Sequence, residues 1–295
     1  MNILITGSSG FIGSHLIERL YNLNLNLFLS TRFVNLNNKD ARFVFHEFMK
    51  HDIEYDINFI KQNNIVGCIH LATKYVKDHK SSDVKDLVNS NLLFSAYILE
   101  CSTRANVKWF INTGTFWQHI ENKIYNPANL YAATKQAFEA IAQYYINTNK
   151  IHFITLKLCD TYGLNDNRLK IFNIWAKAAK YKNEIDMSKG DQIIDICHIS
   201  DVIEAFVKLI DYCKQGTLEN QNGKCFVVKA KKRYTLRDLY DIYNKSTGIE
   251  VKINWGKIPY RDNEVMVPWE FGECVPGWNA KIDLETGLKM TYNNE

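Results

Sequence analysis

The chain has 295 residues, enough for one large α/β body or for a nucleotide-binding domain with a smaller partner. Its 36 basic and 32 acidic side chains give a net charge of only +4, without a basic run or a basic–aromatic stripe, so we expect small-molecule partners and no nucleic acid. Seven scattered cysteines without a CxxC pair argue against a disulfide framework and a zinc site, and no metal is expected.

Two features bear on where the protein resides. The chain enters a predicted strand at residue 2 without a charged leading segment, and it has no run of about eighteen apolar residues. Unpaired cysteines fit a reducing compartment. We therefore expect a cytoplasmic protein that is neither exported nor inserted in a membrane.

The first predicted elements are a strand, a glycine turn and a helix within residues 1–16. Residues 3–5 are apolar and β-type, and Gly7, Gly10 and Gly13 lead from them into an apolar-periodic helix. In such a unit the glycines permit a tight turn, admit a pyrophosphate to backbone N–H groups and let the helix pack closely on the strand. We predict a dinucleotide site here; a purely structural glycine turn is the alternative.

A second strand over residues 25–29 is followed by Thr31 and Arg32. A carboxylate at this position, about twenty residues beyond the glycines, would accept hydrogen bonds from the ribose of NAD. A hydroxyl followed by an arginine instead suits a 2′-phosphate. The pair predicts NADP(H), with NAD(H) the less favoured cofactor; an ordinary surface arginine is the alternative.

Further strands alternate with helices and predict a doubly wound parallel sheet of the Rossmann type. The predicted segments are a strand over 41–48, a helix over 56–63, a strand over 65–71, a long helix over 82–104 that is buried on more than one side, and strands over 107–112 and 151–159. The strand over 107–112 ends in Thr113, Gly114 and Thr115. Ligands bind at the carboxyl ends of such strands, although these hydroxyls could also be turn formers.

Tyr131 and Lys135 lie four residues apart in a predicted helix, so both occupy one face of it. A free phenol with a pKa of about 10 is a poor proton carrier at neutral pH. A nearby ammonium and a cationic nicotinamide both favour the phenolate. Taken alone, such a pair is usually a surface lysine beside a core tyrosine. Because this pair follows a glycine turn and strand-end threonines in this order, it is a specific signal.

Taken together, these segments resemble the extended short-chain dehydrogenases/reductases, a group that includes nucleotide-sugar epimerases, dehydratases and ketoreductases. The matching segments are TGSSGFIG at 6–13, HLA at 70–72, Asn91, the threonine after the fifth strand, YAATK at 131–135 and TYGLND at 161–166. By similarity Tyr131 is the proton donor or acceptor, Lys135 holds the nicotinamide ribose and lowers the pKa of the tyrosine, and Thr113 bonds the reacting carbonyl. The cofactor contacts that the resemblance implies are Gly7, Gly10, Phe11, Ile12, Gly13, Thr31, Arg32, Leu71, Ala72, Thr73, Asn91, Tyr131, Lys135 and Cys159.

Departures from the family pattern narrow the reaction. The dehydratases place an Asp-Glu pair where this chain has Gly114 and Thr115, so dehydration is not expected. The epimerases usually keep NAD through an acid where this chain has Thr31. Reduction with exchangeable NADPH therefore fits better.

Beyond residue 160 the regular alternation ends, and substrate binding is expected to begin with a polar loop over 163–168 and a helix over 171–181. A return strand is expected within 191–202, where Ile194 stands in the place of an arginine that many members direct at a sugar-nucleotide diphosphate. Arg261 could supply that charge, or it could pair with Glu264 or Asp262 at the surface. The candidate substrate residues are Thr115, Asp160, which replaces a common asparagine for no reason that the sequence offers, Arg168 and Arg261.

We therefore predict an NADP-binding Rossmann domain over 1–160, with a return near 191–230, and a substrate-binding domain over 161–190 and 231–295. The predicted reaction is NADPH-dependent reduction of a keto group on a nucleotide-linked sugar, of the 4-keto-6-deoxysugar type used for surface polysaccharides. The alternatives are a nucleotide-sugar epimerase, an NADPH reductase of other ketones, and an NADP-sensing regulatory protein without turnover. The resemblance also implies a homodimer formed through the helices over 82–104 and around Tyr131.

Overall fold

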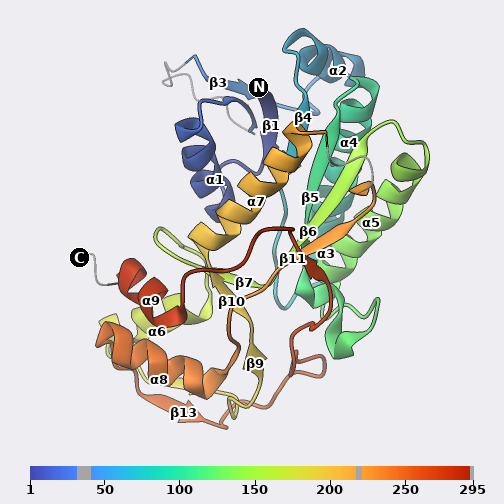
Figure 1. Cartoon of the computed structure of the whole chain (residues 1–295). Helices are drawn as coiled ribbons and strands as arrows, with labels where there is room; N and C mark the ends of the chain where they lie inside the picture. The colour runs from blue at the N-terminus through green and yellow to red at the C-terminus, as the bar shows by residue number, and fades with distance from the viewer. Residues whose placement is uncertain (32–40, 217–220, 293–295) are drawn as a thin grey trace.

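The computed structural model describes residues 1–31, 41–216 and 221–292, and an eight-stranded sheet forms its centre (Figure 1). Every strand pairing in this sheet is parallel. From one edge to the other the strands are β14 (Glu273–Cys274), β11 (Cys225–Val228), β6 (His152–Leu158), β5 (Trp109–Thr115), β4 (Gly67–His70), β1 (Asn2–Thr6), β2 (Asn26–Ser30) and β3 (Phe43–His46). The order reverses beside β1, as in a doubly wound sheet, and the predicted fold class is confirmed.

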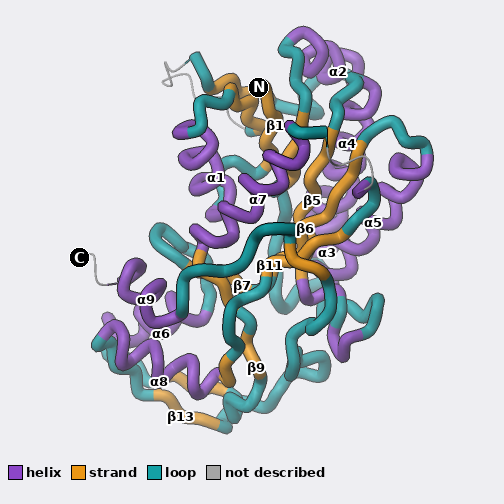
Figure 2. Tube along the Cα trace, in the orientation of Figure 1, coloured by secondary structure: helices purple, strands orange, loops and turns teal. Residues whose placement is uncertain are grey.

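Helices cover both faces of the sheet (Figure 2). The apolar side chains of the central strand β1 explain this arrangement. Ile3 and Ile5 of β1 pack in the apolar cluster that contains residues of α1 and α7, whereas Leu4 between them packs in the cluster that contains residues of α2, α4 and α5. Successive side chains of a strand point to opposite faces, so a strand covered on both sides reads as a continuous apolar run. These helices are α1 (Phe11–Asn22), α7 (Ile199–Lys214), α2 (Ile53–Gln62), α4 (Phe94–Arg104) and α5 (Leu130–Asn147).

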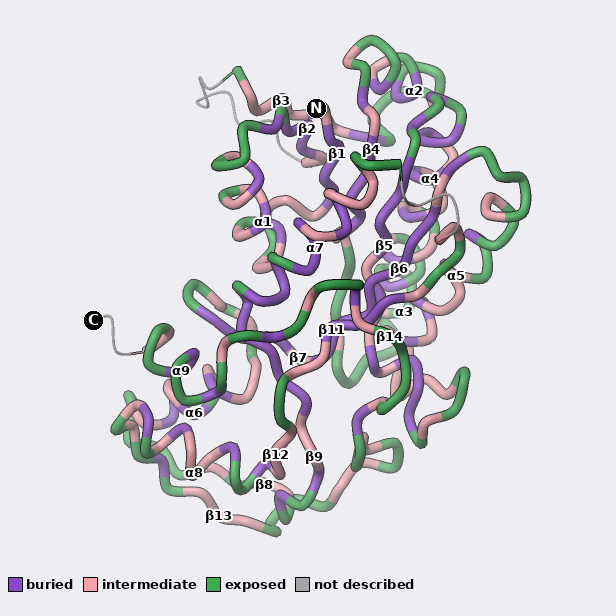
Figure 3. The backbone as a smooth tube through the Cα atoms, viewed as in Figure 1, coloured by how far each residue is buried: buried purple, intermediate pink, exposed green. Residues whose placement is uncertain are grey.

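A third apolar cluster lies outside the sheet, around Trp175 and Tyr243, which are both fully buried. It belongs to the lower part of Figure 1, where the helices α6, α8 and α9 pack with paired short strands. These elements are α6 (Ile171–Lys180), α8 (Leu236–Thr247), α9 (Leu284–Tyr292), β7 (Asp160–Tyr162), β10 (Ile196–His198), β8 (Ile185–Met187), β13 (Ile253–Trp255), β9 (Ile193–Ile194) and β12 (Tyr234–Thr235). Figure 3 shows that the buried residues concentrate in the central sheet and continue into this group.

Three predicted elements differ from the structure. The long helix over 82–104 contains a π-helical turn, η1 (Asn89–Leu93), between α3 (Asp83–Val88) and α4. The fifth strand runs three residues further than predicted, so Thr113 and Thr115 lie within β5 and not after it. The predicted return strand is divided into β9, β10 and the start of α7, because His198 accepts a hydrogen bond from Ser200 N and caps that helix.

Smaller differences concern the ends of elements. The third strand covers only four residues of the predicted eight. The predicted helix over 56–63 begins earlier, at Ile53, because the side chain of Asp52 accepts a hydrogen bond from Tyr55 N at 2.8 Å. Such a cap satisfies a backbone donor at the helix start and moves the boundary toward the N-terminus. Among the described helices, none combines the length and the apolar character needed to cross a membrane.

Candidate functional site

The glycine turn after β1 leaves no room for side chains at two of its positions. Gly7 has a φ of +71°, and a Cβ on it would lie 2.6 Å from the backbone nitrogen of Ala72. A Cβ on Gly13 would overlap the carbonyl oxygen of Gly7. Gly10 caps α1, and its N–H donates to that same carbonyl at 3.1 Å. The start of α1 is therefore a narrow backbone cradle of the kind that receives a pyrophosphate.

A pocket of about 1020 Å³ opens from this cradle along the carboxyl ends of the strands. It brings together segments from β1, β2, β4, β5 and β7 with the start of α5. The predicted site residues that line it are Gly7, Gly10, Phe11, Ile12, Gly13, Thr31, Leu71, Ala72, Thr73, Thr113, Thr115, Tyr131, Cys159, Asp160, Arg168 and Arg261. Ile194 lines it as well, so the position that often carries an arginine contributes apolar surface here.

Two described cofactor candidates, Asn91 and Lys135, are not part of this lining. Arg32 lies outside the described residues, whereas its neighbour Thr31 is in the wall and donates from its backbone N to His46 O at 3.0 Å. Asn91 is fully buried in η1. Lys135 is also buried, one turn beyond Tyr131 on α5, and burial lowers its pKa to about 8 while Glu139 opposes that change.

Asn91 connects two segments of the site. Its Nδ2 donates to Thr134 Oγ1 on α5 at 2.9 Å and to Lys74 O at 3.0 Å. Its Oδ1 accepts from Lys74 N at 2.7 Å and from Thr73 Oγ1 at 2.9 Å. The amide thus ties the loop after β4 to the helix that carries Tyr131, and in this structure it does so from behind the pocket wall.

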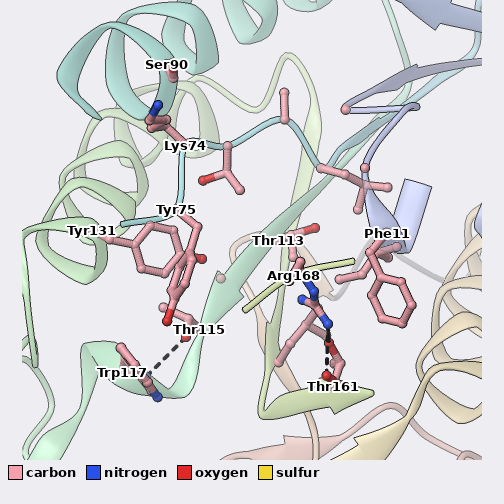
Figure 4. A pocket seen from close by; sticks show the side chains of 18 of the residues that line it. Phe11, Lys74, Tyr75, Ser90, Thr113, Thr115, Trp117, Tyr131, Thr161 and Arg168 are labelled. Atoms are coloured by element: carbon pink, nitrogen blue, oxygen red, sulfur yellow. Dashed lines mark hydrogen bonds between the residues drawn. The ribbon is translucent and has the colours of Figure 1, made fainter. Parts of the chain in front are cut away.

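The two threonines of β5 have different surroundings. Thr115 Oγ1 accepts from Trp117 N at 3.3 Å and caps the short helix η2 (Phe116–Gln118), as Figure 4 shows. Thr113 Oγ1 is buried at the pocket and has no hydrogen-bond partner in the part of the chain that the structure describes. Because an orphaned buried hydroxyl is costly, Thr113 is the threonine whose hydroxyl is available to a ligand.

Tyr131 lies in the first turn of α5, whose start is fixed from two sides. The side chain of Asn129 accepts from Ala132 N at 3.0 Å and donates to Lys77 O at 2.9 Å. The ring of Tyr131 meets the ring of Tyr75 edge to face, with centroids 5.1 Å apart (Figure 4). Burial raises the pKa of Tyr131 to about 12, and the charges that oppose it most are those of Lys170 and Arg168.

This result changes one electrostatic expectation. From the sequence, the ammonium that favours the phenolate is expected to be that of Lys135. In the chain alone burial dominates, and the leading favourable charge comes from Lys170, which sequence reasoning did not single out. Its sequence signal is its place directly before the helix over 171–181, where substrate binding is expected to begin.

The charged residues that the sequence predicts to bind substrate are held in ion pairs. Arg168 Nε lies 2.7 Å from Asp166 Oδ1, and its guanidinium also donates to Thr161 O at 2.9 Å (Figure 4). Arg261 donates to both carboxylate oxygens of Glu264 at 2.9 Å, which is the pairing expected as one alternative. It also lines the pocket, so its assignment to the substrate diphosphate stays a prediction.

Asp160 also has a partner that the sequence did not indicate. Its Oδ1 lies 2.9 Å from Lys170 Nζ, and Lys170 lines the same pocket. Two aromatic residues missed by sequence reasoning, Tyr75 and Trp117, line it as well. Ion pairs and aromatic rings that come from separate loops have no common sequence motif.

Comparisons with known proteins agree with this geometry. The model of the NAD dependent epimerase/dehydratase family matches residues 3–222. The CDP-abequose synthase of Salmonella muenchen is 27% identical over 292 residues, which cover 97% of this chain and 95% of the relative. Two solved structures share the fold, each over 99% of this chain and 98% of the other: a UDP-glucuronic acid 4-epimerase from Bacillus cereus with UDP-glucuronic acid and NAD (TM-score 0.81, 22% identity) and a UDP-glucose 4-epimerase from Thermotoga maritima with UDP-glucose (TM-score 0.79, 21% identity).

Proposed function

This chain belongs to the NAD dependent epimerase/dehydratase family, and on that premise we propose that it is an NADPH-dependent ketoreductase of nucleotide-linked sugars. The observation that carries the proposal is the orphaned hydroxyl of Thr113, which lines one pocket with Tyr131 and the glycine turn. The hydroxyl of Thr113 has a proton to donate, and the carbonyl oxygen of a bound ketone would accept it in a hydrogen bond. The relative from Salmonella muenchen is named for a CDP-linked sugar, which makes a cytidine nucleotide the first to test.

The glycine cradle fits a dinucleotide, because side chains at Gly7 and Gly13 would fill the space beside the start of α1. Gly10, Phe11 and Ile12 would hold the pyrophosphate there, with Leu71, Ala72 and Thr73 along the opposite wall. The preference for NADPH rests on Thr31 and Arg32 in the sequence. The bound dinucleotide supplies the hydride for the reduction.

The residues of the chain supply orientation and a proton. Thr113 Oγ1 donates a hydrogen bond to the carbonyl oxygen, which polarises the carbonyl and fixes its position. Tyr131 Oη then transfers its proton to that oxygen as general acid. Lys135, one turn further along α5, would hold the nicotinamide ribose and favour the phenolate that remains.

Substrate recognition is assigned to the side of the pocket that faces the third apolar cluster. We propose a substrate-binding domain over 161–190 and 231–295, from which β14 returns to the central sheet, with Thr115, Asp160, Arg168 and Arg261 turned toward the sugar nucleotide. The last three line the pocket within ion pairs, so a diphosphate would meet arginines that are already held in place.

The reaction is tested with purified protein, NADPH and a CDP-linked 4-keto-6-deoxysugar. We expect one NADPH to be oxidised for each sugar reduced, followed by absorbance and by a product heavier by two hydrogens. Tyr131→Phe keeps the ring but lacks the proton, so its kcat should fall about 10²–10⁴-fold while NADPH still binds.

Other outcomes identify the alternatives. Interconversion of two sugar epimers at constant NADPH absorbance would assign an epimerase. Turnover of ketones that carry no nucleotide would assign the other reductase class, and tight NADPH binding without turnover of any ketone would favour a regulatory protein.

We also propose a homodimer through α5 and the helical segment over 82–104. α4 and α5 contact one another, and exposed apolar side chains lie beside this contact: Ile141 and Tyr144 on α5, and Leu93 at the end of η1. Light scattering should find twice the chain mass of 34.3 kDa at micromolar concentration, and a monomer alone would contradict the assembly.

A further inference from the structure

Lys170 is held in one place by three neighbours. Its Nζ lies 2.9 Å from Asp160 Oδ1, 4.7 Å from the ring centroid of Tyr75 and 5.5 Å from that of Trp117. Its side chain is 22% exposed and that of Asp160 is 27% exposed, so the pair is largely removed from water. A charge-assisted hydrogen bond together with two aromatic faces leaves a flexible lysine little freedom.

One aromatic ring separates this ammonium from the phenol of the proposed proton donor. Lys170 lies over the ring of Tyr75, and that ring meets Tyr131 edge to face at 5.1 Å (Figure 4 shows the two tyrosines side by side). An ammonium that is separated from a phenol by one aromatic ring, in a pocket partly shielded from water, favours ionisation of that phenol by about tenfold.

We propose that Lys170, anchored by Asp160 against Tyr75, is a positioning residue whose ammonium stabilises the phenolate of Tyr131. The catalytic meaning of that phenolate rests on the proposed function, whereas the electrostatic interaction does not. Asp160 thereby has a role as the anchor of Lys170, because a carboxylate binds the lysine ammonium more strongly than an asparagine would.

The groups around Tyr131 come from three segments. Lys135 lies on α5 itself, Tyr75 and Thr73 lie in the loop after β4, and Arg168 and Lys170 lie where the chain enters α6. Three cations of this region are paired with carboxylates: Lys170 with Asp160, Arg168 with Asp166, and Arg261, near Trp117, with Glu264. Burial raises the pKa of Tyr131, Lys170 opposes this most among the charged groups, and Arg168 follows.

Lys170 stays charged in this environment. Burial opposes its protonation, but Asp160 and Tyr75 together raise its pKa above the ordinary value. The ammonium is therefore present throughout the pH range in which an enzyme of this kind would work.

Nitration by tetranitromethane tests the interaction without cofactor or substrate, because the reagent attacks the phenolate form of tyrosine. Nitration of Tyr131 is measured by peptide mapping relative to Tyr55, a half-exposed tyrosine on α2. We expect about tenfold less nitration of Tyr131 in Lys170→Met and Lys170→Gln, corresponding to about one pKa unit. Lys170→Arg should recover most of the signal, and Lys177→Met, which removes an exposed charge from α6, the helix that follows Lys170, should not change it.

The outcomes are distinct. A folding failure would expose Tyr131 and raise its nitration, so it cannot imitate the expected fall, and Lys170→Gln retains a donor for Asp160 in case the methionine is not tolerated. Unchanged nitration in either folded, uncharged variant overturns the proposal.

A kinetic experiment separates this role from substrate binding. If the chain reduces a nucleotide sugar, Lys170→Met should move the alkaline loss of kcat to higher pH, because a less acidic Tyr131 keeps its proton longer, while the KM for the sugar stays the same. A higher KM with unchanged nitration would assign Lys170 to substrate binding and overturn the proposal. Absence of any turnover would contradict the proposed function, and the nitration result would still decide the interaction.

Discussion

We expect opposite responses to the same substitution at two threonines, Thr113 and Thr6, whose hydroxyl groups are buried at the carboxyl ends of strands. Thr113→Val removes a hydroxyl that has no partner within the described residues, so the free energy of unfolding should stay constant or rise by up to about 1 kcal/mol, while kcat/KM falls about 10²-fold. Thr6 Oγ1 instead contacts His70 Nδ1 at 2.8 Å and accepts from Ala72 N at 3.2 Å. Thr6→Val should therefore cost about 1–3 kcal/mol.

Urea denaturation and steady-state kinetics of both variants check this pair. A large loss of stability in Thr113→Val would mean that its hydroxyl has a structural partner, and the assignment to a carbonyl would lose its basis.

The proposed preference for NADPH depends on Arg32, which is assigned from the sequence alone. We expect NADPH to bind more tightly than NADH, and Arg32→Ala to remove most of that preference, since a charge-assisted contact with the 2′-phosphate contributes about 1.5–3 kcal/mol. Fluorescence titration with both cofactors gives the two dissociation constants. Equal constants in the unmutated protein would reject the assignment to NADP.

At the scale of the element, β1, its glycine turn and α1 act as one unit. The Cβ of Gly13→Ala would overlap the carbonyl oxygen of Gly7, so the helix must move away from the strand. We expect a loss of at least about 1–3 kcal/mol in unfolding free energy together with weaker dinucleotide binding. Gly248→Ala is the matched control: Gly248 ends α8 at a φ of +70° with open space around it, so the backbone strain alone should cost about 1 kcal/mol and leave binding unchanged.

Both variants are compared by urea denaturation and cofactor titration. If Gly13→Ala bound the dinucleotide as well as Gly248→Ala does, the close approach of α1 to β1 would not matter for the site.

The stability of the whole molecule should depend on pH through buried histidines. Burial lowers the pKa of His119 and of His198 to about 4, and it also lowers that of His70. These rings are neutral in the folded chain but protonate in the unfolded chain below about pH 6.5, so stability is fully present above that pH and is lost as the pH falls toward 4. Between pH 7 and pH 5, His119 and His198 should each reduce the free energy of unfolding by about 2 kcal/mol.

His198→Asn isolates one of these contributions. Asparagine can still accept the hydrogen bond from Ser200 N that caps α7, but it does not titrate. Urea denaturation at the two pH values should show a pH dependence smaller by about 2 kcal/mol, whereas replacement of the exposed His79 should leave it unchanged. An unaltered pH dependence in His198→Asn would show that the ring is not kept neutral by burial.

The features that local pattern and chain order control can be predicted from the sequence. Apolar runs separated by amphipathic helices specify a parallel sheet, and the glycines specify a turn in which two positions, Gly7 and Gly13, have no room for a Cβ. Because all strands of such a sheet end on one side, the residues at the carboxyl ends of β1, β4 and β5 are expected to lie close together.

Which of those residues have free functional groups depends on packing. The resemblance favours Thr113 over Thr115 without a physical reason, and the structure supplies one: the turn after β5 engages the hydroxyl of Thr115, whereas that of Thr113 has no hydrogen-bond partner among the described residues. Lys170 is one of many lysines until the fold brings it to Asp160 and Tyr75. Hydrogen bonds, ion pairs and desolvation depend on distances between segments that are far apart in the chain, and those distances arise from packing, which no local periodicity encodes.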